Sequence, residues 1–158
     1  MIHHDTARTG YSTATGPSTS ELYWTASLVD PINSSPAISG GRVCIATISD
    51  GSFSCLDAEG NGDGTTDLIW GFTIGNYGTS PPAVHNGRVY IGSMDNNVCC
   101  LDVAGNGNGR TDQIRNYAIG PYCYSSPTIG NGRVYIGSGD GNIHCFGSTQ
   151  QEIPVLSE

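Results

Sequence analysis

One pattern occurs three times along the chain, and this repetition constrains the fold more than any other feature. Each copy has an Arg-Val dipeptide that opens a short apolar run, and each ends in a second apolar run that contains a cysteine. These cysteines are Cys55, Cys100 and Cys145, so the copies follow one another at a spacing of 45 residues. A period of this length is typical of repeat architectures.

Each copy contains several short apolar segments separated by turn residues. In the second copy the expected strands are residues 80–84, 88–93, 98–101 and 113–118, with an Asn-Gly turn between the first two. No window has the sustained apolar spacing of a helix. Four short antiparallel strands in each repeat of about 45 residues predict an all-β fold built from three four-stranded antiparallel propeller blades.

The repeats also predict the domain organisation. We expect a lead-in with an outer strand (1–30), blade one (31–75), blade two (76–120), blade three (121–147) and a polar tail (148–158). Residues 22–28 match the fourth strands of the first two copies, whereas the third copy stops after its third strand. A strand like 22–28 would complete blade three and remove two open sheet edges.

Three blades are fewer than the roughly four to eight of closed propellers. We therefore expect a homodimer in which Leu22-Tyr23-Trp24 of one copy completes the third blade of the other, giving a six-bladed ring with exchanged edge strands. The alternative is that the chain is one piece of a longer propeller.

Four motifs resemble one known repeat family: Ser35-Pro36-Ala37-Ile38, Gly41-Arg42-Val43, Leu68-Ile69-Trp70 and Asp140-Gly141-Asn142-Ile143. They are similar to the blades of pyrroloquinoline-quinone-like (PQQ-like) β-propellers. The resemblance implies that Trp24 and Trp70 pack between neighbouring blades, and that Asn116 or Tyr117 stands at the corresponding place in blade two.

Members of this family that bind the quinone hold it in a full ring, with a catalytic aspartate, a metal and an adjacent pair of cysteines. Cys99-Cys100 is such a pair in sequence, but neighbours on a strand point to opposite faces. We therefore expect one thiol in the core and one pointing outward. Because only 6 basic residues are available to clamp a tricarboxylate, we expect no PQQ cofactor.

Two long loops, residues 57–67 and 102–112, carry acidic or amide side chains at alternate positions with glycines between them. Hard oxygen ligands at this density suit calcium, as they do in EF-hand loops. The simpler interpretation is that Gly, Asn and Asp only make turns, but the loops are longer than a hairpin requires. The candidate calcium ligands are Asp57, Asn61, Asp63, Asp67 and the Thr65 carbonyl, then Asp102, Asn106, Asn108, Asp112 and the Arg110 carbonyl.

The first loop has more carboxylates, so we expect it to bind calcium more tightly. Cys55, Cys100 and Cys145 share one repeat position and so lie in separate blades, too far apart for disulfides. We expect them to be small core residues. Cys44 and Cys55 lie on strands expected to pair and could be neighbours.

The net charge of −8 makes nucleic acids and anionic membranes poor partners. No apolar stretch approaches the roughly 20 residues of a membrane span, so we expect no membrane insertion. Only 13% of the residues are charged, and a surface of Ser, Thr, Asn and Gly is common in secreted repeat proteins. We therefore expect an extracellular or cell-surface location, although the N-terminus shows no signal sequence.

The chain contains no nucleophile elbow, phosphate loop or dinucleotide fingerprint. We expect a non-catalytic, calcium-stabilised β-propeller module for protein or glycan binding or for assembly. One alternative is a hydrolase or quinone-linked redox enzyme with a site at the centre of the assembled ring. A second is a purely structural propeller fragment without a ligand.

Overall fold

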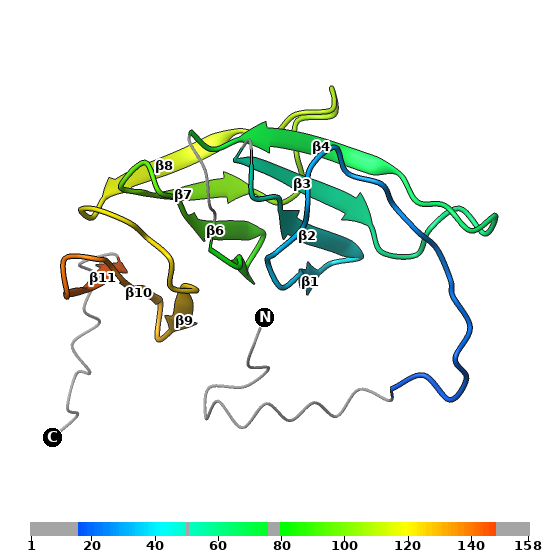
Figure 1. The fold of residues 1–158 in the computed structure, drawn as a ribbon, viewed down its shortest axis with the longest axis horizontal. Helices are drawn as coiled ribbons and strands as arrows, with labels where there is room; N and C mark the ends of the chain where they lie inside the picture. The colour runs from blue at the N-terminus through cyan, green and yellow to red at the C-terminus, as the bar shows by residue number, and fades with distance from the viewer. Residues whose placement is uncertain (1–15, 50, 76–79, 148–158) are drawn as a thin grey trace, which may run out of the picture.

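The computed structural model describes residues 16–49, 51–75 and 80–147, and every regular element in these ranges is a β-strand (Figure 1). The all-β prediction is confirmed. None of the described residues belongs to a helix that could cross a membrane. The predicted lead-in before residue 16 and the tail 148–158 lie outside the described residues.

The first two repeats each form a four-stranded antiparallel sheet in sequential order, as predicted. Blade one consists of β1 (Ala37–Ser39), β2 (Arg42–Ala46), β3 (Ser52–Asp57) and β4 (Leu68–Thr73). Blade two consists of β5 (Ala83–His85), β6 (Arg88–Gly92), β7 (Asn97–Asp102) and β8 (Gln113–Ala118). Both sheets also carry the same bulge, between Cys55 and Leu56 in one and between Cys100 and Leu101 in the other.

Blade three has three strands within the described residues: β9 (Thr128–Gly130), β10 (Arg133–Gly137) and β11 (Ile143–Gly147). β10 lies in the middle of this sheet, so among the described residues no strand pairs with β11 on the side where β4 and β8 pair in the other blades. The expected strand at 22–28 is not formed. The segment contains no assigned strand in this single chain.

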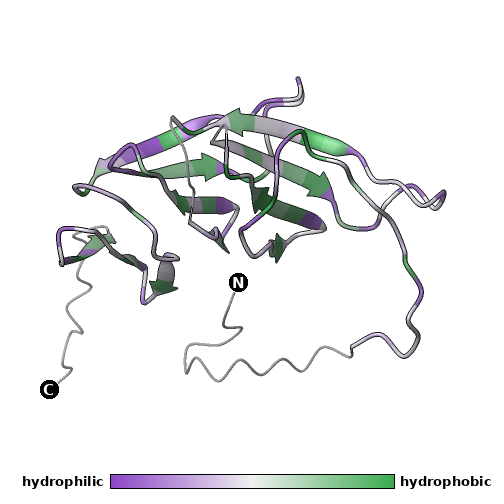
Figure 2. Cartoon of the chain, viewed as in Figure 1, coloured by the Kyte–Doolittle hydropathy of each residue, from purple (hydrophilic) through white to green (hydrophobic). Residues whose placement is uncertain are grey.

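The blades are arranged side by side along an arc, with the inner strands β1, β5 and β9 on its concave side and β4 and β8 on its convex side (Figure 1). The main hydrophobic core lies between blades one and two. It joins Phe53, Cys55 and Trp70 of blade one to Val89 and Leu101 of blade two. Figure 2 shows that the inner strands of these blades are largely hydrophobic, whereas β8 has hydrophilic stretches.

Blade two is buried on both faces, which corrects the expectation that one thiol of Cys99-Cys100 points outward. Cys99 and Cys100 point to opposite faces of β7, yet both are buried. Blade one covers one face of blade two and blade three covers the other, because Cys99 belongs to the first core and Val98 to a second, smaller cluster with Ile136. Neither thiol points into solvent.

Trp70 on the outer strand β4 connects blade one to blade two through a hydrogen bond and through packing. The Trp70 indole Nε1 donates a hydrogen bond to the carbonyl of Val103, 3.0 Å away, and the Gly71 N–H donates to the carbonyl of Gly109, 3.2 Å away. The ring lies against Gly105, where a Cβ atom would overlap the indole. Trp70 therefore packs between neighbouring blades, as the family resemblance implies.

The corresponding residue of blade two is Arg115, which corrects the expectation of Asn116 or Tyr117. Arg115 stands opposite Cys100 just as Trp70 stands opposite Cys55. Tyr117 instead contacts Phe146 of blade three, with ring centroids 4.3 Å apart. The junction between blades two and three is thus built without a tryptophan.

We predict that Gly105→Ala destabilises the protein more than Gly107→Ala. Both glycines have positive φ, 73° and 78°, so an alanine costs about 1 kcal/mol at either position. Only at Gly105 must the new methyl group also displace Trp70, which adds about 2 kcal/mol. Urea unfolding of the two variants measures the difference. Equal losses of stability would show that the indole does not need the close approach.

Candidate functional site

The two candidate calcium loops lie at the same end of their blades. Residues 57–67 connect β3 to β4 and residues 102–112 connect β7 to β8. Each loop is hydrogen-bonded to the first turn of its own blade. The Ala58 N–H donates to the Gly41 carbonyl and the Val103 N–H donates to the Gly87 carbonyl, each at a distance of 2.9 Å. Both loops therefore lie on the side of their sheets that carries these first turns.

In the first loop, two aspartates organise the backbone through turns of their own. Asp57 Oδ1 accepts a hydrogen bond from the Glu59 N–H at 2.8 Å. Asp63 Oδ1 accepts from both the N–H and the hydroxyl of Thr65, at 3.0 Å and 2.6 Å. The Thr65 hydroxyl and N–H favour the carboxylate, so they lower the pKa of Asp63.

Asn61 brings the remaining predicted ligands of this loop together. Its side-chain Nδ2 lies 3.2 Å from both Thr65 Oγ1 and Asp67 Oδ1, and its backbone N–H donates to the Thr65 carbonyl at 2.9 Å. Asn61, Asp63, Thr65 and Asp67 therefore form one connected polar group. The Asp57 side chain is directed to Glu59 instead and is not hydrogen-bonded to that group.

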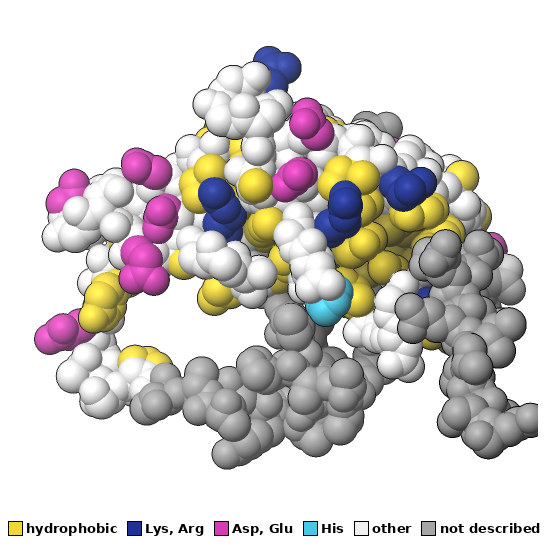
Figure 3. Space-filling view, turned by 180° about the vertical axis from the view of Figure 1, so that it is seen from behind, with side chains coloured by type: hydrophobic (Ala, Val, Ile, Leu, Met, Phe, Trp, Pro, Cys, Tyr) yellow, Lys and Arg dark blue, Asp and Glu magenta, His cyan; other side chains and the backbone are white. Residues whose placement is uncertain are grey.

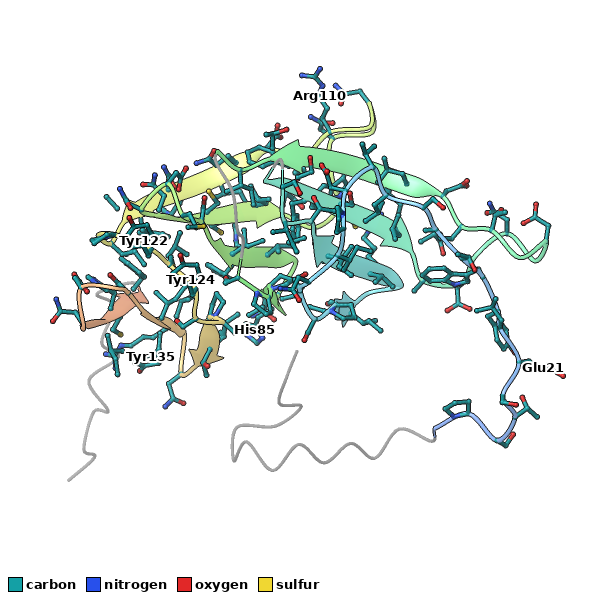
Figure 4. The ribbon with its side chains drawn as sticks, viewed as in Figure 1. Glu21, His85, Arg110, Tyr122, Tyr124 and Tyr135 are labelled. Atoms are coloured by element: carbon teal, nitrogen blue, oxygen red, sulfur yellow. The ribbon has the colours of Figure 1, made fainter. Side chains whose placement is uncertain are left out.

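The second loop repeats this arrangement with weaker contacts. Asn106 Nδ2 lies 3.5 Å from Asp112 Oδ1, and Asn106 Oδ1 accepts a hydrogen bond from the backbone N–H of Asn108 at 3.4 Å. The Asn106 N–H donates to the Arg110 carbonyl at 2.9 Å. The Arg110 side chain itself extends away from the loop tip (Figure 4). Asp102 caps the Ala104 N–H at 2.8 Å, as Asp57 caps Glu59.

The donor chemistry of the first loop fits a hard cation, since it combines carboxylate, amide and hydroxyl oxygens. Within the described residues, no group of three or more His, Cys, Asp or Glu side chains is gathered closely enough to hold a metal. Any ion would therefore depend on Asn61 and on main-chain oxygens in addition to the carboxylates. Figure 3 shows acidic side chains gathered at the end of the molecule formed by this loop.

Five of the six thiols are buried. Cys44 and Cys55 are cross-strand partners with sulfurs 4.0 Å apart, which confirms that they are neighbours. The hydrogen bond that Cys44 donates to Cys55 raises the pKa of Cys44 and lowers that of Cys55. Burial raises the pKa of Cys99 to about 12. Cys145 is exposed, so the expectation of a core residue is wrong there.

The sequence pattern did not reveal a pair of exposed tyrosines between blades two and three. The rings of Tyr122 and Tyr124 are nearly parallel, with centroids 6.0 Å apart and an interplanar angle of 10° (Figure 4). Tyr122 has a φ of 57°, and hydrogen bonds from the Gly139 N–H to the carbonyls of Pro121 and Tyr122 hold this backbone. Such a backbone is uncommon for a bulky residue, and no periodicity signals it.

No family model and no curated protein matches the sequence. Solved structures do resemble the fold. BamB from Moraxella catarrhalis has a TM-score of 0.63 and 21% identity over 79% of this chain. A europium-containing methanol dehydrogenase has a TM-score of 0.63 and 13% identity over 80%. The quinohemoprotein alcohol dehydrogenase ADHIIG from Pseudomonas putida has a TM-score of 0.62 and 18% identity over 80%.

The chain spans 36%, 25% and 21% of the length of these three structures, well under two thirds of each. At such low identity the likeness concerns the fold alone, and the three proteins include both enzymes and BamB. The resemblance inferred from the repeat motifs is confirmed at this level: the chain has the fold of PQQ-like β-propeller blades.

Proposed function

We propose that the chain is a non-catalytic β-propeller module for binding or assembly, and that two copies pair through the open ends of their arcs. The observation that carries this proposal is the exposure of blade three. Ile143 on β11 is 80% exposed, whereas Phe53 and Val98, at the same repeat position, are 0% exposed. The side chain is apolar in all three blades, but in the third nothing covers it.

The opposite end of the arc is open in the same way. Ile38 on β1 is 62% exposed, whereas its counterpart Val84 on β5 is 3% exposed because blade one covers it. Leu22 and Tyr23 are also exposed beside blade one. Both open faces are apolar, and each corresponds to one side of the buried junction between blades one and two. Faces of this kind typically mark interaction sites.

Calcium binding by the first loop is part of the proposal. The group formed by Asn61, Asp63, Thr65 and Asp67 offers several oxygens in a small space. An ion there would hold the loop against Trp24, whose indole donates to the Ala58 carbonyl at 3.0 Å. The ion's role would be structural, since it would fix a loop that lies at the end of the arc.

The contact surface for a further protein or a glycan would be the loops and exposed side chains at the ends of the ring. Surface Ser, Thr and Asn residues supply hydrogen-bonding groups, and Tyr122 and Tyr124 supply flat apolar surfaces. The low content of charged residues, 13%, supports an extracellular or cell-surface location for such a module.

We predict that the purified chain is a dimer in solution. Light scattering should give a mass of about 33 kDa, twice the chain mass of 16.5 kDa. Burial of the two apolar ends is the physical reason. A mass of 16.5 kDa at micromolar concentration would contradict the pairing of two copies.

We predict that calcium stabilises the protein through the first loop. At a free concentration 100 times the dissociation constant, one site adds about 2.7 kcal/mol to the free energy of unfolding. Asp63→Asn should weaken binding about tenfold, because it removes a charge but keeps the oxygen that accepts from Thr65. Calorimetric titration and thermal unfolding, each with and without a chelator, measure both effects.

The second loop supplies the matched control. Asn108 occupies the position of Asp63, so Asn108→Asp adds the carboxylate that the second loop lacks and should strengthen binding there. If calcium gives neither heat nor a shift in unfolding temperature for the unmodified chain, the loops act only as turns.

A further inference from the structure

We infer that residues 22–26 of a second copy form the outer strand of blade three, in the register that β4 and β8 have in the other blades. This inference rests on the proposed pairing of two copies and specifies how they join. The partner segment would lie along the free edge of β11, and each copy would both give and receive one strand.

The segment is already held as an outer strand would be. Trp24 Nε1 donates to the Ala58 carbonyl at 3.0 Å, as Trp70 Nε1 donates to the Val103 carbonyl at 3.0 Å. The Thr25 N–H donates to Gly64 at 3.0 Å, as the Gly71 N–H donates to Gly109 at 3.2 Å.

A Cβ on Gly60 would lie 2.5 Å from the Trp24 ring, and a Cβ on Gly105 would similarly meet the Trp70 ring. Residues 22–26 thus occupy the place that β4 has against blade two, but without the remaining strands of a blade. The segment is an outer strand whose own sheet is missing.

The repeat fixes which residues would face each other. Cys55 is the cross-strand partner of Trp70, and Phe53 is the partner of Phe72. Cys100 and Val98 are paired with Arg115 and Tyr117 in the same way. By this register Cys145 of β11 would face the partner's Trp24, Ile143 would face the partner's Ala26, and His144 would face the partner's Thr25.

The side chains on the two free edges complement each other. Trp24 is only half-buried, whereas Trp70 is fully buried with Phe53 beside it, at 5.8 Å between ring centroids. Ile143 holds the position of Phe53 and would cover the bare side of the partner's Trp24. The apolar surfaces of Ile143 and of the partner's Trp24 are removed from water only when the two edges meet.

A buried polar atom supports the same pairing. His144 Nε2 is screened from solvent and has no hydrogen-bond partner among the described residues, and its nearest carboxylate, Asp140 Oδ2, is 3.8 Å away. In blade two the equivalent Cys99 contacts Asn116 of β8 over 3.5 Å. The exposed Thr25 of the partner would bring a hydroxyl to the corresponding place.

The chain's own copy of the segment cannot fill this place while it contacts the first loop. Residues 22–26 lie beside blade one, and β11 lies at the other end of the arc (Figure 1). A second copy resolves this separation, because its blade one would follow blade three and bring its own residues 22–26 to β11.

A disulfide between engineered cysteines tests the register. Ala26→Cys and Ile143→Cys are introduced together, since directly opposed residues of antiparallel strands have Cα atoms about 4.5–5.5 Å apart, within reach of a disulfide. Oxidation should give a covalent dimer of about 33 kDa under non-reducing conditions, twice 16.5 kDa, and peptide mass mapping should identify the bond between positions 26 and 143.

The matched control is Thr25→Cys with Ile143→Cys, which is one residue out of register and places the two thiols on opposite faces of the sheet. It should cross-link at least tenfold more slowly. Equal cross-linking by both pairs, or a bond formed only within one chain, would overturn the inference. A 33 kDa particle that forms neither bond would also overturn it but leave the dimer standing, whereas a particle of 16.5 kDa would contradict both.

A second measurement uses the native thiols. Cys145 is the exposed cysteine, so a thiol reagent should modify it rapidly in a single chain. In the paired form the partner's Trp24 would cover it, and the rate should fall at least tenfold. Trp24→Ala should restore rapid modification of Cys145 while Cys100, with the same repeat position but buried, stays protected as a measure of intact folding. Rapid modification in the unmodified dimer would contradict the register.

Discussion

The structure depends on the packing of one blade against the next. No sheet has a core of its own, because blade two is covered by a different neighbour on each face and blades one and three are each covered on one face only. The buried residues of blade one, including Phe53 and Trp70, form a single cluster with Val89 and Leu101 of blade two. A blade at the end of the row therefore keeps one apolar face uncovered, and this is the condition in which β1 and β11 are found.

The long loops take part in the same packing. Trp24 and Trp70 each rest on the first glycine of a loop, Gly60 and Gly105, whereas Arg115 stands at the corresponding position before blade three. A loop that bound calcium would act on this junction directly, because the carbonyls that receive the indole, Ala58 and Val103, lie within one residue of its start.

The sequence predicted the strands and turns well because these depend on local patterns, such as the alternation in β6 and the turn at Asn86 and Gly87. Its errors arose where tertiary packing decides. Arg115 is an exception, because the repeat period itself places it 45 residues after Trp70 and both outer strands have the same bulge. Cys99 was expected to point outward because alternation does not show that both sheet faces are covered. The stacked tyrosines depend on the positive φ of Tyr122, which has no sequence signal.

The edge of β11 is the feature on which the proposed pairing of two copies depends. Natural proteins protect free edges with lysine, proline, bulges or inward charges. The sequence of β11 is Ile-His-Cys-Phe-Gly, which contains neither lysine nor proline. An unprotected edge of this kind is a template for pairing with another extended segment. Because a shift of one residue turns every side chain to the other face, the choice of register depends on a residue that fits only one position. Trp24 would meet this requirement in the proposed dimer, since its indole already lies against Gly60 and is only half-buried, which leaves surface for Ile143 of a second copy.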